Sequence, residues 1–175
     1  DKSGFGNHAT PTGVPTLSTA AFGGRSTILL DGATMDLRGS VSITGPTFTL
    51  FAVYQPNGLV GNRDQRVVSF ASAGNSDWNS LLRTTGINIQ AGNYVNQITT
   101  YRNGGIRAAS GTAHVAGVSL IGCTQYTGTS AFVYMNGIQG PTTTDISGDF
   151  GISTYGLANQ ANGGTERLNG NMAEV

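Results

Sequence analysis

The sequence predicts an all-β protein, an antiparallel β-sandwich of the jelly-roll type. Three observations predict it: short apolar segments with strand character recur along the whole chain, turn signals rich in glycine and asparagine separate them, and no long window has helical periodicity. The chain has 175 residues, which suits one domain with its own hydrophobic core, and neither a repeat nor a linker divides it. We therefore expect a single domain.

The strongest strand signal is TFTLFAVYQP, residues 47–56. Both alternating faces of this segment are largely apolar, which predicts a central strand that is covered on both sides and ends at Pro56. Thr85-Gly86 lies between two short apolar runs and predicts a hairpin turn, and Asn136-Gly137 predicts a second one of type I′. The other expected strands are residues 26–32, 66–72, 81–84, 87–90, 96–102, 114–126, 150–156 and 167–175.

Charge is scarce in this chain. Charged residues make up 10% of it, compared with roughly 25% in an average soluble domain. The 9 basic and 9 acidic residues give a formal net charge of zero, Lys2 is the only lysine, and the arginines are scattered. Because phosphate binding needs clustered basic side chains, we expect no nucleic-acid partner. The sequence has no run of ~20 apolar residues, so we expect no membrane insertion.

The residue types most used in catalysis do not form a known arrangement here. Cys123 is the single cysteine and lies in the apolar run VSLIGC, so we expect a buried, unreactive thiol. His8 and His114 are the only histidines, and no serine lies in a G-x-S-x-G motif. Neither a catalytic triad nor a zinc site is therefore expected, and we predict that His114 lies on the surface at the start of a strand.

Five segments, in chain order, carry a resemblance to one superfamily. DKSGFGNHAT (residues 1–10) is similar to the motif D-x-S-G-x-G-N-x-A-T, and FTLFAVYQP (residues 48–56) is similar to F-T-x-F-A-V-x-x-P. Three shorter matches are LDG (30–32), VYMNG (133–137) and LNGNMAEV (168–175). The chain thus resembles the laminin-G-like members, of phage and bacterial type, of the concanavalin A-like lectin/glucanase superfamily. The resemblance implies a concanavalin A-like jelly roll over residues 1–175, as a segment of a longer chain.

The resemblance implies two functions from different classes. Our main expectation is a non-catalytic structural, decoration or adhesion module of a virion, in a phage head, fibre or tail, within a homo-oligomeric assembly of virion or surface proteins. The alternative is a secreted or surface carbohydrate-binding module, such as one attached to a glycosidase. The glucanases of the superfamily carry E-x-D-x-x-E on one strand. This chain has only Glu166 and Glu174, with no E-x-D, so we expect no enzyme.

Two stretches could hold a ligand. In the opening stretch, Asp1, Asn7 and backbone carbonyls could supply oxygen ligands to calcium, and the alternative is a structural opening loop that packs near the last strand. The loop at 73–79 could bind a sugar, because it places the only tryptophan among polar side chains. In the alternative interpretation, the tryptophan covers an edge of the core and its neighbours form turns. The candidate carbohydrate-binding residues are Asn75, Asp77, Trp78 and Asn79.

Overall fold

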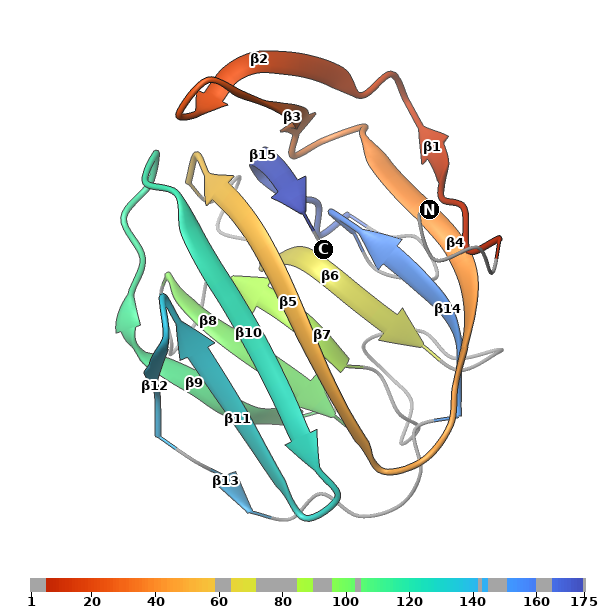
Figure 1. The fold of residues 1–175 in the computed structure, drawn as a ribbon, viewed down its shortest axis with the longest axis vertical. Coiled ribbons are helices and arrows are strands. Elements are labelled where there is room, and N and C mark those ends of the chain that lie inside the picture. Colours follow the sequence, from red (N-terminus) through yellow and green to blue (C-terminus); the bar gives the residue numbers. More distant parts are fainter. Residues whose placement is uncertain are drawn as a thin grey trace.

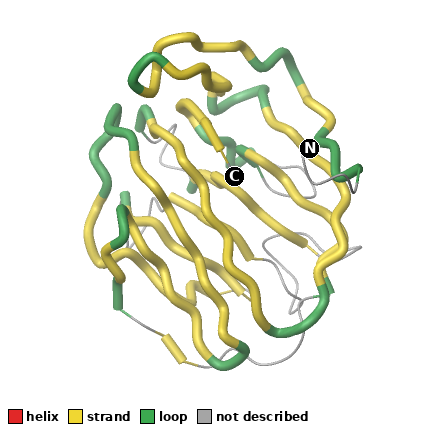
Figure 2. Tube along the Cα trace, in the orientation of Figure 1, coloured by secondary structure: helices red, strands yellow, loops and turns green. Residues whose placement is uncertain are grey.

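The computed structural model describes residues 6–58, 64–71, 85–89, 96–102, 105–141, 143–144, 151–159 and 165–174. These residues form β-strands joined by turns and loops, with no helix among them (Figures 1 and 2). Accordingly, they contain no helix that could cross a membrane. The strands are β1 (Thr10–Thr12), β2 (Thr16–Phe22), β3 (Arg25–Asp31), β4 (Asp36–Ile43), β5 (Thr47–Pro56), β6 (Gln65–Ala71), β7 (Thr85–Ile89), β8 (Gln97–Arg102), β9 (Gly105–Ala113), β10 (Leu120–Thr127), β11 (Ser130–Met135), β12 (Ile138–Gln139), β13 (Thr143–Thr144), β14 (Ile152–Leu157) and β15 (Asn169–Glu174).

The strands form two antiparallel sheets, which confirms the predicted fold class. Sheet A has the order β1-β4-β14-β6-β7-β8-β9, and sheet B has the order β12-β11-β10-β5-β15-β3-β2, with β13 paired to β11. In Figure 1, strands β5, β10 and β11 lie side by side in front of β6, β7 and β8. Neighbours in a sheet are often distant in sequence: β15 lies between β3 and β5, and β14 lies between β4 and β6.

The core lies between the two sheets, and strands β5 and β11 of sheet B contribute alternate residues to it. In strand β6 of sheet A, by contrast, every residue is buried. This central strand of sheet A also carries polar side chains, and Gln65 and Arg66 are buried within it. The buried side chains of the core cluster include Leu30, Leu50, Tyr54, Val67, Phe70, Ile98, Leu120, Tyr126, Val133, Ile152, Leu168 and Met172.

Strand β5 is central, as expected, but it is covered on one side only. Leu50, Ala52 and Tyr54 point into the core, whereas Phe51 points the other way and is 58% exposed. Side chains alternate across a strand, so one face meets the core and the other faces outward. The expectation of cover on both sides is therefore wrong, because sheet B forms an outer layer of the sandwich.

Of the two predicted hairpins, one is confirmed and one is wrong. Asn136-Gly137 connects β11 to β12, with φ angles of 53° and 82°. In contrast, Thr85-Gly86 lies inside β7, where the two residues pair with Phe70 and Ser69 of β6. A threonine–glycine pair is only a weak turn signal, and pairing with the buried strand β6 decides its conformation.

His114 is buried, so the prediction of a surface position is wrong. The expected strand at residues 114–126 is also shorter, because the strand β10 begins at Leu120. His114 is only 6% exposed, and its ring Nδ1 lies 2.6 Å from the carbonyl oxygen of Asn96. The backbone N–H of His114 donates to the same carbonyl at 2.8 Å. This residue therefore joins the end of β9 to the start of β8.

Two buried tyrosines give a matched test of core polarity. The Tyr126 hydroxyl lies 2.5 Å from Thr100 Oγ1 and links the two sheets. The Tyr54 hydroxyl is buried without a hydrogen-bond partner in the described part of the chain, and burial raises its pKa. We expect Tyr54→Phe to be neutral or stabilising, and Tyr126→Phe to lower the free energy of unfolding by about 1 kcal/mol. Urea unfolding of both variants would measure this; equal losses would contradict it.

Candidate functional site

The sugar-binding loop predicted from the sequence lies outside the described residues. Asn75, Asp77, Trp78 and Asn79 all fall in this gap, between β6 and β7. A sugar site in this loop stays a prediction.

The described end of the opening stretch is attached to strand β14. The Tyr155 hydroxyl donates to the backbone carbonyl of Asn7 at 2.9 Å. Tyr155 pairs with Gly39 of β4, and a Cβ added at Gly39 would lie 2.6 Å from the tyrosine ring. The ring thus lies where only a glycine leaves room. This attachment supports the structural interpretation, although the contact is with β14 and not with the last strand.

The calcium interpretation of the opening stretch is not tested by the structure. Asp1 lies outside the described residues, so the two predicted ligands, Asp1 and Asn7, are not placed together. Among the residues that are described, no group of three or more His, Cys, Asp or Glu side chains could hold a metal ion. Calcium at Asp1 and Asn7 stays a prediction.

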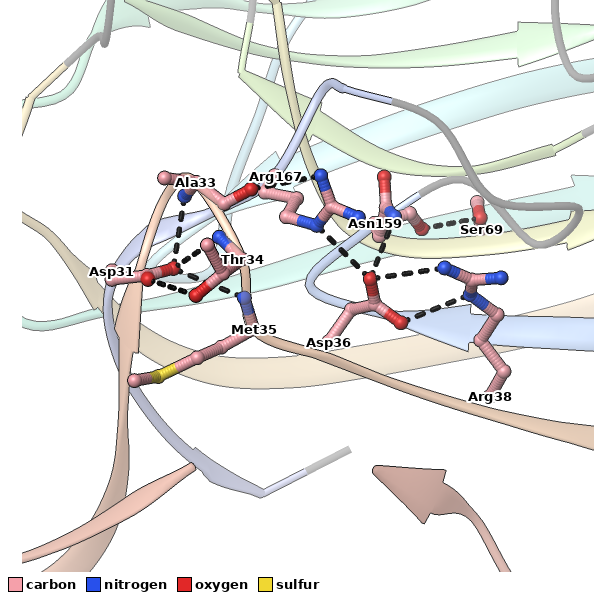
Figure 3. A network of polar contacts seen from close by, with 9 residues as sticks. All are labelled: Asp31, Ala33, Thr34, Met35, Asp36, Arg38, Ser69, Asn159 and Arg167. Carbon is pink, nitrogen blue, oxygen red and sulfur yellow. Dashed lines mark hydrogen bonds and ion pairs between the residues drawn. The ribbon is translucent and has the colours of Figure 1, made fainter. Parts of the chain in front are cut away.

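Asp31 closes the connection between β3 and β4 (Figure 3). Its carboxylate accepts the backbone N–H groups of Ala33, Thr34 and Met35 at 2.9, 2.8 and 3.1 Å, and the Thr34 hydroxyl at 2.5 Å. Partial burial by itself would raise the pKa of Asp31, but these four hydrogen bonds outweigh it and hold the pKa well below its usual range. The aspartate of the LDG motif therefore has a structural function in this turn.

Asp36 forms a second, buried polar centre, which we call the Asp36 clamp (Figure 3). The fully buried carboxylate accepts two hydrogen bonds from Arg38, at 2.9 and 3.1 Å. It also accepts one from Arg167 Nε at 3.0 Å and one from Asn159 Nδ2 at 2.9 Å. Burial would raise the pKa of Asp36, but the hydrogen bonds and the guanidinium groups lower it. The clamp joins β4 to residues on both sides of the β14–β15 connection.

Removal of the Asp36 carboxylate tests the clamp. Asp36→Ala leaves two guanidinium groups without their anion, so we expect a loss of about 3–5 kcal/mol in the free energy of unfolding. Arg38→Ala is the matched control, because Arg38 is one-third exposed and Asp36 keeps its other two partners. This control should lose about 1 kcal/mol or less. Denaturant unfolding measures both, and similar small losses would show that the clamp contributes little.

The lowered pKa values of Asp31 and Asp36 predict acid sensitivity. A carboxyl whose pKa is lower in the folded state stabilises the fold above its unfolded pKa of about 4 and loses this contribution as the pH falls. The denaturant midpoint should therefore drop as the pH falls from about 5 to about 2. The variant Asp31→Asn should show a smaller drop. An unchanged pH profile in that variant would contradict the structural function of the carboxylate.

The outer side of sheet B carries aromatic side chains. We define the aromatic face as Thr49, Phe51 and Val53 of β5, Ile121, Cys123 and Gln125 of β10, and Phe132 and Tyr134 of β11. These residues alternate with core residues, and residues directly opposite each other on neighbouring strands share a face. The pairs form three rows across the strands, which are Ile121–Val53, Tyr134–Cys123–Phe51 and Phe132–Gln125–Thr49.

Cys123 lies in the middle row of the aromatic face. Its burial confirms the prediction, since it is 7% exposed and burial raises its thiol pKa. However, this residue is not part of the core cluster. It lies on the outer side of the sheet, directly between Phe51 and Tyr134 in register. Cys123 therefore separates Phe51 from Tyr134 on one side of the sheet and exposes little surface of its own.

Amide groups lie on the same side of sheet B as the aromatic face. The Tyr134 hydroxyl donates to Gln125 Oε1 at 3.5 Å, a long hydrogen bond. Beside the face, Gln55 Nε2 donates to the Gly117 carbonyl at 2.7 Å, and Asn171 Nδ2 donates to Gln55 Oε1 at 3.1 Å. Strands β5, β10 and β11 contain no charged residue and no histidine. The surface they present is therefore aromatic, amide-bearing and neutral.

Comparisons with known proteins place this architecture among solved β-sandwiches. A scan of protein-family models finds no match, and neither does a search of curated proteins. Domain 4 of AbnA, a GH43 extracellular arabinanase from Geobacillus stearothermophilus solved with arabinotriose, has a TM-score of 0.64 at 15% identity. The alignment covers 95% of this chain and 79% of that one.

Two further solved structures share the fold. The carbohydrate-binding module CBM66 from Bacillus subtilis has a TM-score of 0.53 at 14% identity and covers 95% and 91% of the two chains. A SAP-like pentraxin from Limulus polyphemus has a TM-score of 0.59 at 13% identity and covers 93% and 72%. At these identities the likeness shows the fold alone. The concanavalin A-like superfamily and its laminin-G-like and phage types stay predictions.

Proposed function

We propose that this β-sandwich is a non-catalytic module that binds glycans at the cell surface or outside the cell. The observation that carries the proposal is the neutral aromatic face of sheet B. Its Phe51 side chain is 58% exposed and Ile121 is 49% exposed, although neither belongs to the core cluster. Exposed apolar patches with polar neighbours commonly mark binding surfaces.

The chemistry of this face suits a sugar. A sugar ring has an apolar side made of C–H groups, which stacks on an aromatic ring, and hydroxyl groups around its edge. Phe and Tyr rings supply the flat apolar surface. The Gln125 amide both donates and accepts hydrogen bonds, as sugar hydroxyl groups do. The alternative expectation from the sequence, a carbohydrate-binding module, is therefore the function that the structure supports best.

The fold neighbours give independent support. One is a domain solved in complex with arabinotriose, and another is a carbohydrate-binding module. The first belongs to an extracellular enzyme, which supports a location outside the cell or at its surface. The virion role expected from the sequence gains no corresponding support. It stays a prediction, together with the homo-oligomeric assembly.

The contacts of Asp31, Asp36 and Glu166 support a module without hydrolase activity. A glycosidase needs a carboxyl group whose pKa is raised, so that it can donate a proton near neutral pH. The pKa values of Asp31 and Asp36 are instead lowered, because hydrogen bonds hold both groups as carboxylates. Glu166 forms an ion pair with Arg66 at 2.6 Å. These groups hold the fold together and are poorly suited to proton transfer.

Affinity electrophoresis with a panel of polysaccharides tests the proposed function. The panel contains neutral chains such as arabinan, xylan, mannan and β-glucan, and anionic chains such as alginate and pectate. We expect at least one neutral polysaccharide to retard the protein, without release of reducing sugar. A protein of similar size that binds no glycan is the mobility control. If no polysaccharide retards the chain, the proposed function is wrong.

A further inference from the structure

On the proposed function, we infer that the aromatic face binds a neutral, extended oligosaccharide that runs across strands β5, β10 and β11. The aromatic rings of Phe51 and Tyr134 then lie under alternate sugar units.

The spacing of the two rings sets the direction of the chain. Phe51 and Tyr134 each pair directly with Cys123, from opposite sides. They are therefore two strand spacings apart, roughly 9–10 Å. This distance is close to that between alternate sugars of an extended chain. Along β5, the outward residues next to Phe51 are Thr49 and Val53, so a glycan along that strand would meet one ring only. Along β11, Phe132 and Tyr134 are only about 7 Å apart, which does not match the spacing of alternate sugars.

The three rows of the aromatic face differ in polarity, which gives the glycan a preferred orientation. The middle row is apolar apart from the Tyr134 hydroxyl and suits the flat faces of sugar rings. On one side, Gln125 and Thr49 can hydrogen-bond the hydroxyl groups of a chain that lies on the middle row. On the other side, the row of Ile121 and Val53 is apolar, and it ends at β15, where Glu174 pairs with Val53. An oligosaccharide whose hydroxyl-rich edge lies over Gln125 and Thr49 matches this pattern.

The charge of the face indicates the class of glycan. Strands β5, β10 and β11 contain no arginine, lysine or histidine that could pair with a carboxylate or sulfate group. Elsewhere, the guanidinium groups of Arg38 and Arg167 already bind the carboxylate of Asp36. An anionic sugar on the aromatic face would lose hydration without gaining a cation, which is unfavourable. A neutral glycan has no charged group, so its binding does not remove the hydration of a charge.

Titration calorimetry with oligosaccharides of increasing length tests the inference. The ligands are the mono-, di-, tri- and tetrasaccharides of a neutral polysaccharide that retards the protein. We expect at least a tenfold gain in affinity from the monosaccharide to the trisaccharide, because only the longer chain reaches both rings. Phe51→Ala and Tyr134→Ala should each weaken trisaccharide binding at least tenfold. Tyr134→Phe keeps the ring and should retain most of the affinity.

Control variants show whether a loss of binding is specific to the aromatic face. Val14 is 78% exposed and lies between β1 and β2, so Val14→Ala should bind as the unaltered chain does. Circular dichroism and urea unfolding of each variant check that it folds. Trp78→Ala tests the loop predicted from the sequence. If that variant loses binding while Phe51→Ala and Tyr134→Ala bind normally, the inference is wrong and the proposed glycan-binding function stands.

Two other outcomes would also overturn the inference. Preferred binding of alginate or pectate would contradict the neutral class of ligand. If sedimentation shows self-association that Phe51→Ala abolishes, and no glycan binds, the aromatic face is an interface between copies of the chain. In that case the inference and the proposed function fail together.

Discussion

A single buried carboxylate, that of Asp36, fixes the β14–β15 connection, one of the places where the chain crosses from one sheet to the other. Strand β14 belongs to sheet A and β15 belongs to sheet B. Asn159, just after β14, and Arg167, just before β15, both bind Asp36. A buried carboxylate is stable only when hydrogen bonds and opposite charges replace its hydration. The clamp therefore requires both ends of the crossing to converge on β4.

The crossing decides what sheet B can present to its surroundings. Because β15 enters between β3 and β5, strand β5 has neighbours on both edges and lies inside the sheet. Its inner side chains, such as Leu50 and Tyr54, then fill the core, and Phe51 is left on the outside. The outward side of such a sheet is ordinarily polar. The aromatic rings that occupy it here are not needed to form the core, which is why we assign them to binding.

The charged groups described here and the aromatic face have separate functions. Asp31 stabilises the turn between β3 and β4, and Asp36 stabilises the connection between β14 and β15. The ion pair of Arg66 with Glu166 attaches that connection to β6. A fold such as this one supports many activities, so the function has to be argued from particular side chains. The uncharged strands β5, β10 and β11 of sheet B present aromatic and amide side chains outside the core.

The sequence by itself determined the fold class, the turn at Asn136-Gly137 and the burial of Cys123. These features depend on local patterns: alternation of apolar residues, a dipeptide that accepts left-handed backbone angles, and an apolar run around the thiol. The sugar-binding loop at 73–79 and the calcium ligands Asp1 and Asn7 were inferred from residue types, and they stay predictions.

Only the tertiary structure decided which side of each strand faces outward and which distant residues meet. Asp36 and Arg167 are 131 positions apart, and no local pattern links them. The apolar alternation of β5 is compatible with cover on one side or on both, and the layer position of sheet B selects one. Phe51 and Tyr134 lie on one surface because both pair with Cys123 in register, and strand register depends on contacts between segments that are remote in sequence.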